Sequence, residues 1–240
     1  MSEGIFYLTP LVCVIIKFVG KGNIMAGFVE NLKEFIPFML QGSLVTVEIF
    51  VLTIVLSLPL GLPFAFGENS KFKPLRWLCQ AYVGLFRGTP LLLQMLFFYL
   101  FFPLILGWQV SAFWSVIIAF VLNYAAYFAE IFRGGINSID QGQYEAAYSL
   151  GFTKGQTMRM IILPQTMTAI LPAIMNETIT LVKDTALAYT IGVVELMKAT
   201  NSAVNRLTDV TPFFYAALIY LIMTIILTVL SKKLEEKFAF

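Results

Sequence analysis

The sequence contains no histidine, two cysteines and few charged residues. Charged residues make up 12% of its 240 residues, about half of the roughly 25% that is typical of soluble domains. The two cysteines, Cys13 and Cys79, lie far apart in apolar surroundings, so neither a disulfide framework nor a metal site of the histidine–cysteine type is expected. Lysine and arginine number 16 against 14 aspartates and glutamates, and this near balance leaves no basic surface for nucleic acid.

Apolar residues take the place of the missing charge. They form 59% of the chain, 23 residues are phenylalanine, and the mean hydropathy is +0.83. This composition excludes intrinsic disorder, and a soluble domain of this length needs more charge to cover its surface. The composition therefore predicts a protein whose solvent is the lipid bilayer.

Five apolar stretches are long enough to cross a membrane, because a spanning helix needs about 20 mostly apolar residues. The sequence thus predicts an all-α membrane protein with a core bundle of five spans, formed as a single domain by residues 25–240. The spans are expected near residues 41–66, 77–106, 113–132, 163–191 and 213–230.

Residues 1–24 do not fit this domain. Their apolar part, 5–18, is short for a span and contains Pro10. A signal peptide begins with positive charge, whereas Glu3 is negative. We therefore expect an N-terminal extension, with Met25 as a candidate for the true start and an interfacial segment as the alternative.

The basic residues indicate the orientation. We place the loop after the first span, the loop after the third span and the C-terminus on one side. That side then holds ten lysines and arginines, and the opposite side holds five. Because cytoplasmic loops carry the excess of positive charge, the N-terminus is expected outside and the C-terminus in the cytoplasm.

The loop at 133–162, between the third and fourth spans, contains helix signals of its own. Residues 141–150 are mostly good helix formers. Gly151 can end a helix because it tolerates a left-handed backbone, and Thr153 is a suitable N-cap for the helix that follows. The pattern predicts a short helix across the cytoplasmic face, with an ordinary amphipathic connector as the alternative.

The spacing in this loop resembles the EAA signature of bacterial ABC-importer permeases, with Glu-Ala-Ala, Gly151 and Leu163-Pro164 at the expected separations. Further segments, at 86–92, 130–136, 181–187 and 191–196, are similar to permeases for histidine, arginine, glutamine and related solutes, and the resemblance covers about residues 26–238. It implies that the short helix is a coupling helix, which contacts an ATP-binding subunit. Its expected contact residues are Tyr144, Glu145, Ala146, Ala147, Leu150, Gly151 and Phe152.

The resemblance also implies the partners of the chain in a bacterial cell membrane. They are a second permease chain, identical or related, two cytoplasmic ATP-binding subunits, an extracytoplasmic solute-binding protein and an amino-acid solute. The sequence has no Gly-x-x-x-x-Gly-Lys-Ser/Thr loop, so it is not expected to bind ATP in that way. ATP and Mg²⁺ are expected on the partner subunits, and this chain is expected to transport solute without catalytic residues, metal or cofactor of its own.

Polar side chains inside the spans predict a solute site. An ionisable group at the bilayer centre costs about 2.5–3.5 kcal/mol and usually faces a cavity or the bundle interior. Asn123 and Tyr127 share one face of the third span, and Glu177 and Thr180 share a face of the fourth. Asn123 and Glu177 are expected at the same depth near the midplane, where transporters bind their solutes. We expect these four residues to bind the solute, and Glu177 favours a basic amino acid; hydrogen bonds that only join helices are the alternative.

Candidates for the pathway or a gate lie in two segments and comprise Arg87, Thr89, Pro90, Lys183 and Asp184. In the first segment, glycine and proline are expected to bend the second span. In the second, the two charges are expected to pair with each other or with a neighbouring helix. Glu130 is expected to pair with Arg133 as a loop anchor and not to bind solute.

Two other classes of protein remain open at this point. An ion-driven secondary transporter usually has two related halves, and the sequence contains no convincing internal repeat. A membrane-embedded enzyme needs a convergent set of nucleophile, base or metal ligands. The lack of histidine weakens this alternative. A neighbouring gene for a Walker-type ATPase would favour the importer.

Overall fold

A computed structural model describes the backbone of residues 22–238 and the side chains of residues 35–237. In this part of the chain every regular element is helical, which confirms the all-α class. The elements are α3 (Gly22–Glu68), α4 (Lys73–Gly88), α5 (Leu91–Ile105), α6 (Ala112–Ser138), α7 (Gln141–Ser149), α8 (Lys154–Thr157), a π-helical turn η1 (Met158–Ile162), α9 (Leu163–Asp184), a 3₁₀ helix η2 (Thr185–Ile191), α10 (Leu196–Leu207) and α11 (Thr211–Phe238). Most of the expected extension, residues 1–21, lies outside the described residues, and its last three residues begin α3.

Within the described residues, four helical segments are long and apolar enough to cross a membrane, or five if one bent pair counts as a span. The four are Phe35–Glu68, Ala112–Ser138, Lys154–Ile191 and Thr211–Lys237, and they contain the spans expected at 41–66, 113–132, 163–191 and 213–230.

The span expected at 77–106 is not one continuous helix. It is divided into α4 and α5, which meet at an angle of 106°. The break lies between Gly88 and Leu91, at the glycine and proline that predict a bend. Pro90 cannot donate a backbone hydrogen bond, so the helix cannot continue through it without losing one.

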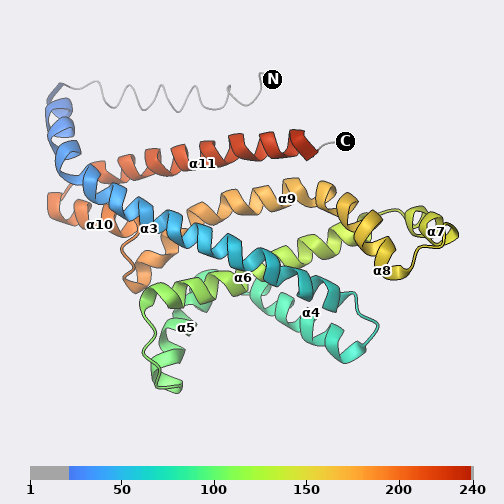
Figure 1. Cartoon of the computed structure of the whole chain (residues 1–240). Helices are drawn as coiled ribbons and strands as arrows, with labels where there is room; N and C mark the ends of the chain where they lie inside the picture. The colour runs from blue at the N-terminus through green and yellow to red at the C-terminus, as the bar shows by residue number, and fades with distance from the viewer. Residues whose placement is uncertain (1–21, 239–240) are drawn as a thin grey trace.

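The central helix is α6, which crosses the middle of the molecule with α9 and α11 on one side and α4 and α5 on the other (Figure 1). In its apolar window 72% of the residues are buried, against at most 28% in the other three segments. Small residues let neighbouring helices approach closely, as is common between membrane helices. An added Cβ at Gly61 of α3 would lie 3.0 Å from Ala125 O and Ala129 N, and one at Gly135 would overlap with Ile170 of α9.

Two opposite ends of the bundle carry the short helices. We call them the α7 end, where α7 and α8 project, and the α10 end (Figure 1). The predicted start and stop signals of α7 and α8 are present in the structure. Gly151 has φ +82°, and Thr153 caps α8 through a reciprocal pair of hydrogen bonds with Gln156. At its own start, α7 is capped by Asp140, which accepts a bond of 2.7 Å from Gly142 N.

Candidate functional site

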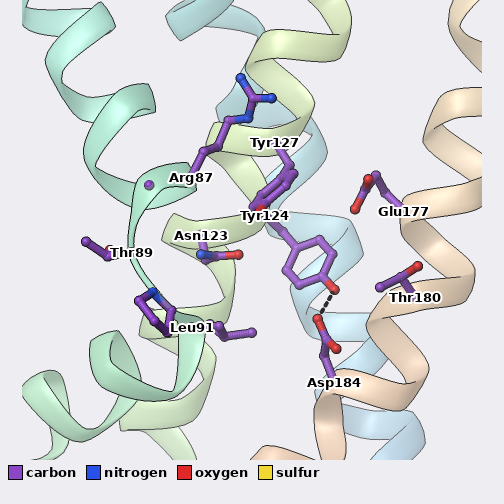
Figure 2. Close-up of a pocket in the computed structure, with 11 residues that line it drawn as sticks. Arg87, Thr89, Leu91, Asn123, Tyr124, Tyr127, Glu177, Thr180 and Asp184 are labelled. Atoms are coloured by element: carbon purple, nitrogen blue, oxygen red, sulfur yellow. Dashed lines mark hydrogen bonds between the residues drawn. The ribbon is translucent and has the colours of Figure 1, made fainter.

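A cavity of about 490 Å³ lies between the α4–α5 break, α6 and α9. Its wall combines charged, polar and aromatic side chains inside an otherwise apolar bundle, and Figure 2 shows how they face one another across it. The lining residues are Arg87, Gly88, Thr89, Pro90, Leu91, Asn123, Tyr124, Tyr127, Glu177, Thr180 and Asp184.

The structure brings together the four residues expected to bind solute, Asn123, Tyr127, Glu177 and Thr180, because all of them line this cavity. Asn123 of α6 and Glu177 of α9 thus face the same cavity, and their common depth near the midplane stays a prediction. The pathway candidates Arg87, Thr89, Pro90 and Asp184 line it too, whereas Lys183 does not and its side chain is exposed.

The α4–α5 break is held by two amide side chains. In a continuous helix the carbonyl of Phe86 would accept from residue 90, but Pro90 has no N–H to donate. Gln94 Nε2 and Asn123 Nδ2 each donate to Phe86 O instead, both at 2.9 Å. Gln94 Nε2 also lies 3.0 Å from Thr89 O and 2.8 Å from Thr89 Oγ1, and Asn123 Nδ2 lies 2.9 Å from Gln94 Oε1.

Gln94 and Tyr124 were missed by reasoning from the sequence. Gln94 is the one amide in the apolar helix α5, four residues after Pro90, and that spacing was an available signal. Tyr124 is buried and its hydroxyl donates a hydrogen bond of 2.7 Å to Asp184 Oδ2 (Figure 2). Asp184 thus pairs with a neighbouring helix, which is one of the two arrangements expected for it.

A ladder of alternating charges leads from the cavity wall towards the α7 end. We define the charge ladder as Arg87, Glu130, Arg133 and Glu68. Glu130 lies 3.6 Å from Arg87 and accepts bonds of 3.0 and 2.6 Å from Arg133 Nε and Nη2, so the expected pairing of Glu130 with Arg133 is confirmed. Arg133 Nε is also 3.9 Å from Glu68 Oε2. The Arg87 guanidinium, in addition, lies over the ring of Tyr127, 5.5 Å from its centre.

The residues expected in the coupling helix lie at the α7 end. One face of the helix packs against the chain: Ala147 is 1% exposed, and Gln165 of α9 donates a hydrogen bond of 3.1 Å to Gln143. The other face is exposed: Glu145, Ala146 and Gly151 are exposed, and Leu150 is 76% exposed. Tyr144 is half-buried, and burial raises the pKa of its hydroxyl.

The α10 end contains a buried carboxyl group, Glu195, which lies outside the spans. Glu195 is fully buried and caps α10, where it accepts bonds of 2.8 Å from Met197 N and 2.7 Å from Lys198 N. Tyr220 of α11 donates to it at 3.0 Å. Loss of hydration on burial raises the pKa of the Glu195 carboxyl to about 7, although these donors favour its charged form.

The fold and the cavity define a class of protein. A bundle of membrane-length helices encloses a polar cavity with charges of both signs, as is typical of proteins that pass a polar solute across the bilayer. Comparison with known proteins identifies the family within that class.

Residues 57–239 match the family described as "Binding-protein-dependent transport system inner membrane component", and the chain belongs to this family. The family is a membrane permease component of ABC transporters, and membership implies ATP-binding and solute-binding partners and a second permease. The ion-driven transporter that remained open from the sequence is not favoured.

Individual relatives agree with this membership. The arginine transport system permease protein ArtQ of Bacillus subtilis (strain 168) is 41% identical over 203 residues, which are 84% of this chain and 93% of ArtQ. The L-cystine transport system permease protein TcyB of the same organism is 36% identical over 207 residues, 85% and 88% of the two chains. A crystal structure of an amino acid ABC transporter with histidines is similar with a TM-score of 0.81 at 33% identity, over 86% of this chain and 96% of that chain.

Proposed function

We propose that this chain is the translocation subunit of an ATP-driven importer for a basic L-amino acid, and that the solute binds in the cavity between the α4–α5 break, α6 and α9. The observation that carries the proposal is the placement of opposite charges on facing walls of a membrane cavity, with Arg87 on one wall and Glu177 and Asp184 on the other. Ionisable groups at membrane depth are costly and usually mark a pathway. The relatives' names, which refer to arginine and L-cystine transport, support an amino acid as the solute.

The cavity can satisfy each polar group of such a solute. The guanidinium of Arg87 attracts the α-carboxylate, since arginine binds carboxylates through several donors at once. Glu177 attracts the cationic end, with Asp184 as a second negative charge near it. Asn123, Tyr127 and Thr180 supply hydrogen bonds between these poles. Two acidic groups against one basic group favour a basic over a neutral amino acid.

The remaining subunits attach at opposite ends. Two such chains, identical or related, form the pathway, and an ATP-binding subunit that holds ATP and Mg²⁺ docks on α7 of each. The exposed Glu145 and Gly151 and the exposed apolar Leu150 support this docking. The α7 end then faces the cytoplasm, as its basic loops predict, and an extracytoplasmic solute-binding protein delivers solute to the α10 end. Closure of the ATP-binding pair pulls both α7 helices and opens the cavity outward.

The test uses the complete complex reconstituted in lipid, with ATPase activity measured against the concentration of L-arginine, L-lysine, L-histidine and L-glutamine. Glu177→Gln is expected to raise the half-stimulating concentration of the basic amino acids about tenfold or more, because it removes one charge from the site, and to affect L-glutamine less. Glu236→Gln, an exposed carboxyl near the C-terminus, is the control. Equal effects on basic and neutral solutes would contradict the charge assignment.

The same assay tests the α7 contact. Gly151→Leu places a side chain where the backbone is left-handed and is expected to abolish stimulation while the permease remains in the membrane. A complex that assembles and responds normally with Leu at 151 would contradict coupling through α7.

A further inference from the structure

The polarity of the cavity wall can be traced to one side chain that does not line the cavity. Backbone carbonyls accept hydrogen bonds and never donate them. Gln94 Nε2 lies against Phe86 O and Thr89 O, at 2.9 and 3.0 Å, so the amide of Gln94 is held in one orientation. Its other end, Oε1, is thereby presented to Asn123.

The fixed orientation of Gln94 determines the orientation of the Asn123 amide. Its two nearest partners, Phe86 O and Gln94 Oε1, are both acceptors, so the amide nitrogen must face them and the carbonyl oxygen must face away. Figure 2 shows that oxygen on the side of Asn123 that looks towards α9, across the cavity. No described residue donates a hydrogen bond to it. An asparagine turned the other way would offer the solute a donor; this one offers an acceptor.

We infer that Gln94 is a positioning residue that sets the specificity of the cavity: through Asn123 it presents a hydrogen-bond acceptor on the cavity wall, which selects a solute with an N–H donor at that point. The inference rests on the proposed binding of solute in this cavity. This arrangement depends on the break between α4 and α5. Pro90 has no N–H to donate to the carbonyl of Phe86, so this carbonyl accepts from Gln94 and Asn123 instead and orients both amides. Gln94 is 8% exposed and Asn123 is 4% exposed, so both amides are largely shielded from bulk water.

The first test compares Gln94→Met with wild type in the reconstituted complex, with the four amino acids named above. Methionine is close to glutamine in shape and cannot form these hydrogen bonds. We expect the half-stimulating solute concentration to rise about tenfold, while the rate at saturating solute changes less than the half-stimulating concentration does. Gln80→Met, an exposed glutamine on α4, is the matched control and should behave as wild type. A loss of saturated rate at unchanged half-stimulating concentration would show that Gln94 is structural only and would overturn the inference.

A double-mutant cycle tests whether Gln94 acts through Asn123. Asn123→Leu removes the acceptor and should raise the half-stimulating concentration by a similar factor. The double variant should then resemble the single ones, since Gln94 has nothing left to orient. Multiplied effects, about a hundredfold in the double variant, would mean that the two residues act independently.

Gln94→Glu provides a rescue that does not depend on how the methionine variant folds. A protonated carboxyl can donate to Phe86 O and accept from Asn123, as glutamine does, whereas a carboxylate can only accept. The affinity of Gln94→Glu for solute should therefore improve, relative to wild type, as the pH is lowered. A ratio of the two affinities that does not change with pH overturns the inference.

The outcomes distinguish this inference from the proposed function. If no amino acid stimulates the complex, or if Glu177→Gln changes nothing, it is the proposed solute site that fails. A response to Glu177→Gln without one to the Gln94 variants rejects the positioning role alone.

Discussion

Two groups of charged side chains lie along α6, and they differ in how their charges are paired. In the charge ladder, Glu130 lies between Arg133 and Arg87, and Arg133 also faces Glu68. In the cavity, Glu177 and Asp184 face open space, and among the described side chains neither has a lysine or arginine within 4.0 Å. The same helix thus borders a neutralised cluster and a cluster with an excess of negative charge.

The difference separates structural from functional charge. A paired carboxylate between helices replaces part of its lost hydration by its partner, so the ladder can serve to join α3, α4 and α6. Carboxylates without a basic partner at membrane depth carry an uncompensated cost, and the hydroxyl of Tyr124 offsets only part of it for Asp184. A cationic solute supplies the missing partner. Arg87 belongs to both groups, since it contacts Glu130 and also lines the cavity.

The largest effect is therefore expected from Arg87→Met, which disturbs both groups at once. The thermal stability of the complex should fall, and the half-stimulating solute concentration should rise roughly thirtyfold, because a hydrogen bond to a charged group contributes about 1.5–3 kcal/mol. Thermal unfolding and solute-stimulated ATPase activity measure the two effects separately. Arg87→Lys keeps the charge without the planar fork and should lie between wild type and Arg87→Met; a change in stability alone would remove Arg87 from the solute site.

Glu130→Gln is expected to affect one group only. It removes the carboxylate shared by Arg133 and Arg87 and should destabilise the protein by about 2 kcal/mol, less than for a fully buried pair because both partners are partly exposed. The half-stimulating solute concentration should stay within about twofold of wild type, since twofold corresponds to only about 0.4 kcal/mol. Glu236→Gln is again the control. A shift in solute affinity as large as that of Glu177→Gln would erase the distinction between the two groups.

The sequence predicts these two groups to different degrees, for physical reasons. Spacing along a helix places Asn123 with Tyr127, and Glu177 with Thr180, because residues three or four apart share a face. Equal depth then brings the two helices' polar faces together. The bend in the second span was predictable from its glycine and proline, but its angle of 106° depends on packing against α6.

Contacts between distant segments were beyond reach of the sequence. The link from Arg133 to Glu68 joins helices far apart in the chain, and only the pair from Glu130 to Arg133, three residues apart, follows from local spacing. Gln94 is similar: its position after Pro90 is visible in the sequence, but the amide orientation depends on Phe86 O and Asn123 being brought beside it.

Glu195 sharpens the comparison with no expected effect on solute binding, since it is a buried carboxyl that does not line the cavity and has no arginine partner among the described side chains. Its pKa is about 7 in the folded protein against 4.5 for a free glutamate side chain, so between these values the folded state holds a proton that the unfolded state has lost. The stabilisation is complete below about pH 4.5 and is lost as the pH rises through about 7, by at most about 1.4 kcal/mol per pH unit. Glu195→Gln mimics the protonated form and should lack this slope. Thermal unfolding of both proteins across this range measures it: the wild type should lose stability relative to Glu195→Gln as the pH rises, and parallel curves would mean that the backbone N–H donors of α10 keep Glu195 ionised throughout.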